Sequence, residues 1–212
     1  MKARAAHPHE HFESLAQQQH AARLGMWIFL ASELLLFGAL FTLFAAQRAH
    51  YPDGFAEAVR HNTKVLGSVN TGVLLTSSAL VASAVHAARA GRRAAAMARV
   101  SGTVALGVAF VAIKLVEYGI HVEEGILPGG QGRFFLEHET PGLVPFWNMY
   151  WVTTGLHLVH VTVGLGVLAV MLVSIARRSA IGALAHRLEI AAIYWHLVDV
   201  VWIFLWPLLY LS

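Results

Sequence analysis

The sequence predicts an all-α membrane protein, a five-transmembrane-helix bundle with its amino terminus in the cytoplasm. Three observations support this fold class. The 212 residues are 57% hydrophobic and 13% charged, with a mean hydropathy of +0.60, which is too apolar for one soluble domain. Five apolar stretches have the length of a membrane span, and most basic residues lie on one side of them. We divide the chain into a polar cytoplasmic amino-terminal segment, residues 1–23, and a five-helix transmembrane domain, residues 24–212.

The amino-terminal segment is rich in histidine, with His7, His9, His11 and His20 among Glu, Gln and Arg residues. We interpret it as a solvated tail. Its His-x-His spacing also suits opportunistic metal binding, and its imidazoles titrate near neutral pH, so the tail is a candidate for collecting protons. The apolar stretch that follows is longer than a signal-peptide core and lacks a convincing small-residue cleavage site, so we expect it to be retained.

The five apolar stretches predict transmembrane helices over residues 24–46, 65–86, 100–120, 146–175 and 188–211. Each is near the ~20 residues that cross a ~30 Å hydrocarbon core. In the first connection, the Tyr-Pro-Asp-Gly sequence at 51–54 is a strong turn signal. The connections over 87–99 and 177–187 are short and basic. The connection over 123–145 contains Gly/Pro turns and four acids, Glu123, Glu124, Glu137 and Glu139.

The distribution of basic residues predicts the orientation of the bundle. Of the 15 Lys and Arg residues, ten fall on the amino-terminal side of the predicted spans: Lys2, Arg4, Arg23, Arg89, Arg92, Arg93, Arg99, Arg177, Arg178 and Arg187. Four fall on the opposite side: Arg48, Arg60, Lys64 and Arg133. The positive-inside rule then places the amino terminus in the cytoplasm and the carboxyl terminus outside.

Several function classes are disfavoured by the sequence. It contains no cysteine, which removes disulfides, thiolate metal ligands and cysteine nucleophiles. The net charge of +3 does not indicate nucleic-acid binding, because the basic residues lie in short turns between membrane spans. Phosphate-binding glycine loops, His-Glu-x-x-His pairs and Gly-x-Ser-x-Gly elbows are also missing from the sequence. We therefore expect no self-sufficient catalytic site.

Two of the predicted spans carry carboxylates at membrane depth. Glu33 stands about ten residues into the first span, so it lies ~15 Å deep, near the bilayer centre. It is either a proton-linked or lipid-contacting site or an acid hydrogen-bonded to a neighbouring helix. In the third span, Lys114, Glu117, Tyr118 and His121 share one helix face. Lys114 and Glu117 can pair within one turn, and we favour a structural ion pair over a proton route.

The last two spans carry histidines and an aspartate. His157 and His160 are three residues apart, as are His196 and Asp199, so each pair can share a helix face. A metal site on His157 and His160 would need further ligands at matched depth, which His196, Asp199 and Glu33 could supply. We favour histidines hydrogen-bonded across helices. Small and hydroxyl residues let helices approach closely, so we expect helix packing from Asn70, Thr71, Gly155 and Gly164.

Each of the five spans carries a distinctive motif, in the order Met26-Trp-Ile-Phe-Leu-Ala-Ser-Glu33, Asn70-Thr71-x-Val-Leu-Leu, Glu117-Tyr118, Gly155-Leu-His157-x-x-His160-Val-x-x-Gly164 and Tyr194-Trp-His-x-Val-Asp-Val-Val-Trp-Ile-Phe. In this order the motifs closely resemble subunit III of the heme-copper terminal oxidases, and they cover the sequence from about Arg23 to Ser212. The last of these motifs is the most specific.

The resemblance implies an accessory subunit of a bacterial inner-membrane oxidase that binds no haem or copper itself. It implies packing beside catalytic subunit I, in a complex whose haem and copper lie in subunit I and in the cytochrome c or copper-site subunit II, and lipids held between helices. Glu33 corresponds to the family's membrane-buried, carbodiimide-reactive glutamate. Four residues correspond to its interior polar positions, His157, His160, His196 and Asp199.

The chain departs from the seven-helix members, because it starts at their third helix and lacks the pair that forms one wall of a lipid-holding cleft. We expect a role in stabilising the catalytic subunit and supporting proton uptake in a proton-translocating oxidase that uses cytochrome c. Quinol oxidases and nitric oxide reductases are alternative complexes. A free-standing proton carrier using Glu33, Lys114–Glu117 and Asp199 is a second hypothesis, and a metal or haem protein using His157, His160 and His196 is a third.

Overall fold

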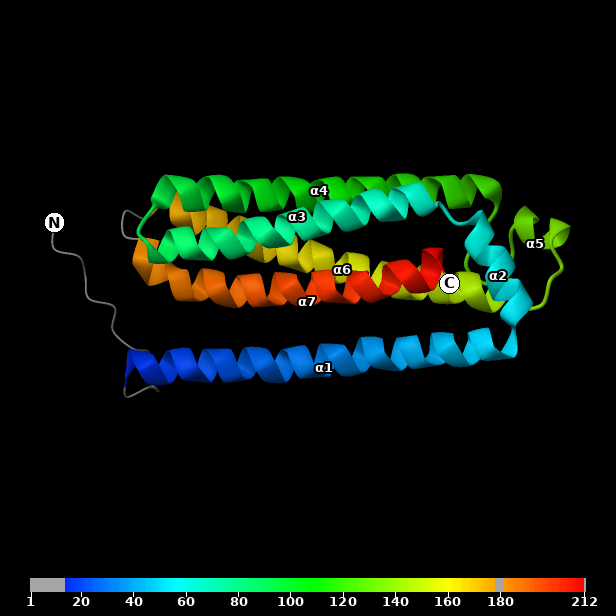
Figure 1. Ribbon diagram of the computed structural model, residues 1–212, viewed down its shortest axis with the longest axis horizontal. Helices are drawn as coiled ribbons and strands as arrows, with labels where there is room; N and C mark the ends of the chain where they lie inside the picture. Colours follow the sequence, from blue (N-terminus) through cyan, green and yellow to red (C-terminus); the bar gives the residue numbers. More distant parts are fainter. Residues whose placement is uncertain (1–13, 178–180, 212) are drawn as a thin grey trace.

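The computed structural model describes residues 14–177 and 181–211, and five long helices form its bundle (Figure 1). They are α1 (Leu15–His50), α3 (Lys64–Arg89), α4 (Arg93–Glu124), α6 (Leu143–Arg177) and α7 (Ala185–Tyr210). All five are long and apolar enough to cross a membrane, and the described part of the chain contains no strand. The predicted all-α bundle with five membrane helices is thereby confirmed.

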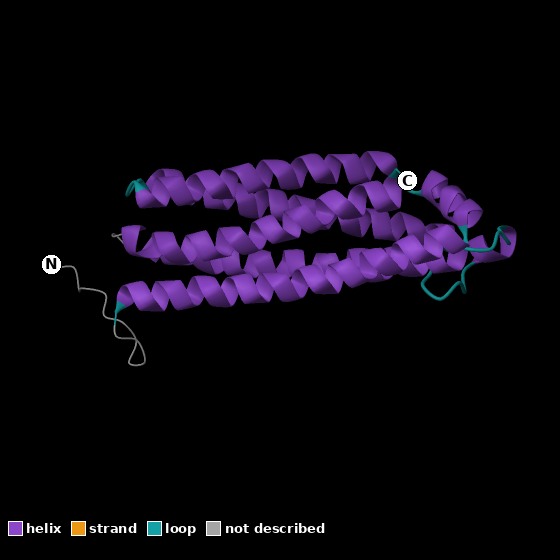
Figure 2. Cartoon of the chain, turned by 60° about the horizontal axis from the view of Figure 1, so that its bottom comes forward, coloured by secondary structure: helices purple, strands orange, loops and turns teal. Residues whose placement is uncertain are grey.

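Short elements connect the long helices at the ends of the bundle. Figure 2 shows that the loops gather at these two ends. Helices α2 (Pro52–His61) and α5 (Arg133–Glu137) lie at the end opposite the start of α1 (Figure 1), which we call the α2/α5 end. At the other end α3 turns tightly into α4, and a 3-10 helix, η1 (Ile181–Leu184), precedes α7. Successive connections between the long helices thus lie at opposite ends of the bundle, as the count of basic residues assumed. The cytoplasmic location of the amino terminus stays a prediction.

Helix α1 is longer than its predicted span. Its amino end is capped by Ser14, whose Oγ accepts a hydrogen bond from Gln17 N–H at 3.1 Å. At ~1.5 Å per residue its 36 residues extend about 54 Å, well beyond a ~30 Å hydrocarbon core. Part of the predicted polar segment is therefore helical and includes the exposed His20. The tail histidines His7, His9 and His11 lie outside the described residues.

The Tyr-Pro-Asp-Gly sequence, which predicts a turn, lies at the junction between two helices. Helix α1 ends at His50, and Pro52 is the first residue of α2. Proline suits a first helical position because its missing N–H would have no partner there. Gly54 lies inside α2, where a Cβ atom would stand 2.2 Å from Pro141 O. The glycine therefore permits close contact between α2 and the segment before α6, rather than a bend.

Helix α7 lies at the centre of the bundle, and Trp195 is its main packing residue. In the most apolar stretch of α7, 61% of the residues are buried, against 17% in the corresponding stretch of α1. Trp195 is fully buried and its Nε1–H donates to Ser77 Oγ of α3 at 3.0 Å. The same indole ring packs against Gly107 of α4 and Gly164 of α6. One side chain of α7 thus contacts three other membrane helices.

Helix α1 packs on one side of this core, against α6 and α7. A groove of about 410 Å³ runs between α1 and α7, lined by apolar residues and His196. Large apolar side chains of α1 are exposed in the isolated chain, including Trp27, Ile28 and Leu35. Such a surface suits lipid tails or another membrane protein.

A glycine pair in α6 tests this packing. A Cβ at Gly164 would lie 2.9 Å from the Trp195 ring and 3.1 Å from the Tyr194 ring, whereas a Cβ at Gly155 would meet nothing within 4 Å. We expect Gly164→Val to lower the free energy of unfolding by about 1–3 kcal/mol, since overpacking forces side chains off their rotamers. Gly155→Val is the control and should change stability little. SDS-titrated unfolding in mixed micelles measures both, and equal losses would contradict the packing role of Gly164.

Candidate functional site

The most deeply buried polar site lies among α4, α6 and α7. Lys114 Nζ stands 3.2 Å from Glu117 Oε1, one turn along α4. The hydroxyls of Tyr150 and Tyr210 each donate to Glu117 Oε1 at 2.6 Å. Lys114 Nζ donates to the same two hydroxyl oxygens at 3.1 and 2.9 Å. The predicted ion pair thus forms, and two tyrosines from other helices bond to one of its carboxylate oxygens, whereas Glu117 Oε2 has no hydrogen-bond partner among the described residues.

Aromatic rings surround the ammonium group of this site. Lys114 Nζ lies 4.9 Å from the centre of the Tyr150 ring and 5.4 Å from that of Trp202. The side chains of Lys114 and Glu117 are 1% and 0% exposed. At such burial a lone charge would be very costly, so the phenol hydrogen bonds and the ring faces are what make the pair tolerable. This geometry favours a structural ion pair.

A second polar pair joins α1 to α6. His160 Nε2 lies 2.9 Å from Glu33 Oε2, and the two side chains are 15% and 14% exposed. The Phe37 ring meets the imidazole edge-on at 5.3 Å between centroids. Tyr194 of α7 donates its hydroxyl to His160 O at 3.0 Å. Glu33 therefore bonds to a neighbouring helix, which was one of the two readings of its sequence.

The hydrogen bonds of His160 determine how many protons this pair holds. Its Nδ1 lies 2.8 Å from Leu156 O, and because a carbonyl can only accept, Nδ1 must carry a hydrogen. Nε2 and the Glu33 oxygen then hold one proton between them. The pair is either imidazolium with carboxylate or neutral imidazole with carboxylic acid. In both arrangements its net charge is zero, which lowers the cost of placing it in a membrane.

His196 and Asp199 of α7 face α3. His196 Nδ1 and Ser78 Oγ are 2.6 Å apart. Asp199 is 3% exposed and lies beside the same serine, and it makes no hydrogen bond of ordinary geometry with any described residue. Ser78 is therefore a common neighbour of the two residues. The sequence did not single out Ser78, because it is one of several hydroxyl residues in α3.

The other predicted polar and packing residues differ in burial and in hydrogen bonding. His157 is buried and stacks on Trp202 at 5.2 Å between ring centroids. Asn70 is buried, and Thr71 Oγ1 accepts from Trp202 Nε1–H at 3.0 Å. Within the described chain, neither ring nitrogen of His157 and neither amide atom of Asn70 has a hydrogen-bond partner. Gly164 packs closely, whereas Gly155 makes no such contact with this chain.

The histidines proposed for a metal or haem site are not brought together. His160 faces Glu33, His196 faces Ser78, and His157 lies among the Phe110 and Trp202 rings. Among the described residues, the one group of three His, Asp or Glu side chains with converging donor atoms lies elsewhere. Nothing in this arrangement supports the hypothesis of a metal or haem protein built on His157, His160 and His196.

Comparisons with known proteins agree on one family. The family model described as cytochrome c oxidase subunit III matches residues 10–136 and 142–212. A probable quinol oxidase subunit 3 of Staphylococcus haemolyticus is 30% identical over 201 residues, 94% of this chain and 92% of the relative. The quinol oxidase subunit 3 of Bacillus spizizenii is 30% identical over 188 residues, 89% of this chain and 85% of the relative.

A third relative, the quinol oxidase subunit 3 of Bacillus subtilis, is 29% identical over 188 residues, 89% of this chain and 85% of the relative. The matches span all five membrane helices and confirm the resemblance found from the motifs. With five apolar helices, the chain is a multi-pass bacterial membrane protein. It belongs to the cytochrome c oxidase subunit III family, the subunits III of heme-copper oxidases.

Proposed function

We propose that this chain is an accessory subunit that stabilises the catalytic subunit of a terminal oxidase during turnover, with a quinol as the electron donor. The observation that carries the accessory role is the internal pairing of two sets of ionisable side chains at membrane depth. Lys114 and Glu117 pair in a buried site, and Glu33 pairs with His160 between α1 and α6. Family membership implies that the redox centres lie in partner subunits, so this chain contributes through contact with them.

The exposed apolar surface of α1 supports a contact role. Its large side chains, including Leu35 at 76% exposure, form a face with no partner inside the described chain. The groove between α1 and α7 reaches His196 from this same side of the bundle. A lipid tail or a helix of the catalytic subunit fits such a face. The Glu33–His160 pair holds α1 against α6, so that this face stays turned outward.

The electron donor is proposed from the relatives. The family model carries the name of cytochrome c oxidase, in agreement with the cytochrome c donor expected from the motifs. The curated relatives described above are named quinol oxidase subunit 3, and they cover most of the chain, which favours a quinol. Subunit III is not expected to bind the donor, so the assignment concerns the complex as a whole.

Purification from mild detergent through a tag on this chain tests both parts of the proposal. We expect a large catalytic subunit and haem to co-purify, giving a reduced-minus-oxidised difference spectrum. The complex should oxidise a quinol and not reduced cytochrome c. Cytochrome c oxidation would overturn the donor assignment alone.

The same preparation separates the accessory role from the rival carrier. A complex from cells lacking this chain should start at a similar rate per haem and then lose activity over repeated turnovers. If a colourless chain purifies alone, under conditions that preserve such complexes, and conducts protons in liposomes, the accessory role is wrong and the free-standing carrier is right.

A further inference from the structure

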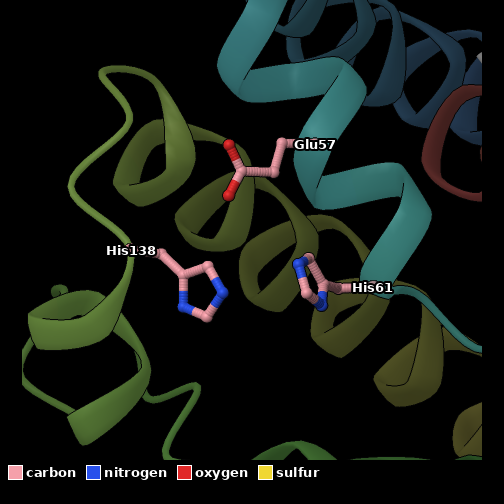
Figure 3. A group of neighbouring side chains, drawn as sticks. All are labelled: Glu57, His61 and His138. Atoms are coloured by element: carbon pink, nitrogen blue, oxygen red, sulfur yellow. The ribbon is translucent and has the colours of Figure 1, made fainter.

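A group of metal-ligand side chains lies outside the membrane helices, at the α2/α5 end. Figure 3 shows the Glu57 carboxylate and the imidazoles of His61 and His138 gathered between α2 and the segment after α5. One donor atom of each residue lies within 4.8 Å of the others. Glu57 and His138 are half-buried and His61 is exposed, so ions from water can reach the group. The polar pairs described above lie within the bundle and take no part in it.

The fold brings these donors together from two connections. Glu57 and His61 are four residues apart on α2, so they share a helix face. The opposite side of α2 is fixed by Phe55, which packs against Phe44 at 5.2 Å and Phe146 at 5.3 Å between ring centroids. His138 directly follows α5, which belongs to the connection between α4 and α6.

The His138 ring is held in the orientation that a metal ligand needs. It stacks on Phe134 at 4.3 Å between centroids, with 17° between the planes. Its Nδ1 lies 3.0 Å from Phe134 O, and because the carbonyl can only accept, Nδ1 carries the hydrogen. Nε2 then keeps its lone pair for a metal. This backbone support of the second ring nitrogen is typical of histidines that bind metals.

The three side chains converge without bonding to one another. Within the described residues, no hydrogen bond joins any two of them, and Glu57 takes part in none of the ion pairs. The His61 ring meets the His138 ring edge-on at 5.1 Å and the Phe134 ring at the same distance. Two imidazoles and one carboxylate match the ligand types of zinc, which binds them at about 2.0–2.2 Å. The donor atoms lie within 4.8 Å of one another, so small side-chain rotations would place all three at zinc-ligand distance.

We propose that Glu57, His61 and His138 bind one Zn²⁺ ion, which fastens α2 to the segment after α5 and leaves a fourth position for water. The ion links the connection between α1 and α3 to the connection between α4 and α6. Zinc has no redox chemistry, so the site serves structure rather than electron transfer.

Zinc titration of the full chain in detergent tests the site. The chain carries a tag without histidine, and His7, His9, His11 and His20 are changed to Gln so that the tail does not compete. Competition with a chelating dye should report one Zn²⁺ per chain. His61→Gln and His138→Gln should each weaken binding at least about tenfold, whereas His50→Gln, an exposed histidine outside the group, should bind like the parent.

Two further readouts distinguish this site from loose surface binding. Zn²⁺ should raise the melting temperature of the parent and of His50→Gln, but not of the other two variants, because only ligands of the native state stabilise it. Co²⁺ in place of Zn²⁺ should give visible absorption bands that His138→Gln abolishes. All variants should keep the parent's helical circular dichroism without metal. Binding that is absent, or that is the same in parent, His61→Gln and His138→Gln, would overturn the proposal.

Discussion

Replacing Glu117 with leucine is expected to lower the free energy of unfolding by about 3–5 kcal/mol, the loss typical of breaking a buried ion pair from one side. The variant leaves the Lys114 ammonium 1% exposed with no carboxylate beside it. It also removes the acceptor for the hydroxyls of Tyr150 and Tyr210. SDS-titrated unfolding of the purified chain, followed by tryptophan fluorescence, measures the loss.

The double variant Lys114→Met with Glu117→Leu is the matched control. Replacing both partners of a buried pair with apolar side chains is often neutral or stabilising, so the double variant should recover most of the stability that Glu117→Leu loses. Recovery would identify the unpaired charge as the cause. Equal stability of Glu117→Leu and the parent, or a double variant less stable than either single variant, would contradict the role of this pair.

Replacing Trp195 with alanine should cost about 3–5 kcal/mol, in the range seen for buried tryptophans. Helices in a membrane associate largely through van der Waals packing, and this ring packs on glycines of α4 and α6 while bonding to Ser77 of α3. The cavity would therefore loosen three helix contacts at once. The same unfolding titration applies, with circular dichroism as the signal.

Two other tryptophan variants serve as controls for Trp195→Ala. Trp195→Phe should retain most of the stability, because the ring still fills much of the space and Ser77 Oγ keeps its hydrogen bond to Leu74 O at 2.7 Å. Trp27→Ala removes a side chain that is 62% exposed and should change the stability of the isolated chain little. A Trp195→Ala variant no less stable than Trp27→Ala would show that α7 is not held in the way described.

Hydropathy alone was enough to predict the five spans, because a membrane helix must satisfy its backbone internally and expose apolar side chains. The pairing of Lys114 with Glu117 also followed from local spacing. The two tyrosines of that site could not be predicted, since they come from α6 and α7. The residues of α7 are largely apolar on every face of the helix. Its sequence therefore does not indicate which face carries Tyr210 toward α4.

Other features were hidden by ambiguity in local signals. The proline at 52 marks a turn or the first residue of a helix equally well, and in the structure it begins α2, whose Gly54 packs closely against Pro141. Glu57 and His61 have metal-ligand spacing in the sequence, but their third partner, His138, lies in a distant connection. Glu33 was recognised as a buried acid, whereas its partner depended on how α1 turns against α6.

The packing of α1 has a consequence for how the protein assembles during synthesis. Helices α3 and α4 are neighbours in sequence and in space, so they can pair as soon as they enter the membrane. Helix α1 leaves the ribosome first, yet its long-helix partners, α6 and α7, emerge last. Glu33 therefore lies in the bilayer without its partner His160 until α6 has been inserted. The closing of α1 onto α6 and α7 is a late, long-range step of biogenesis.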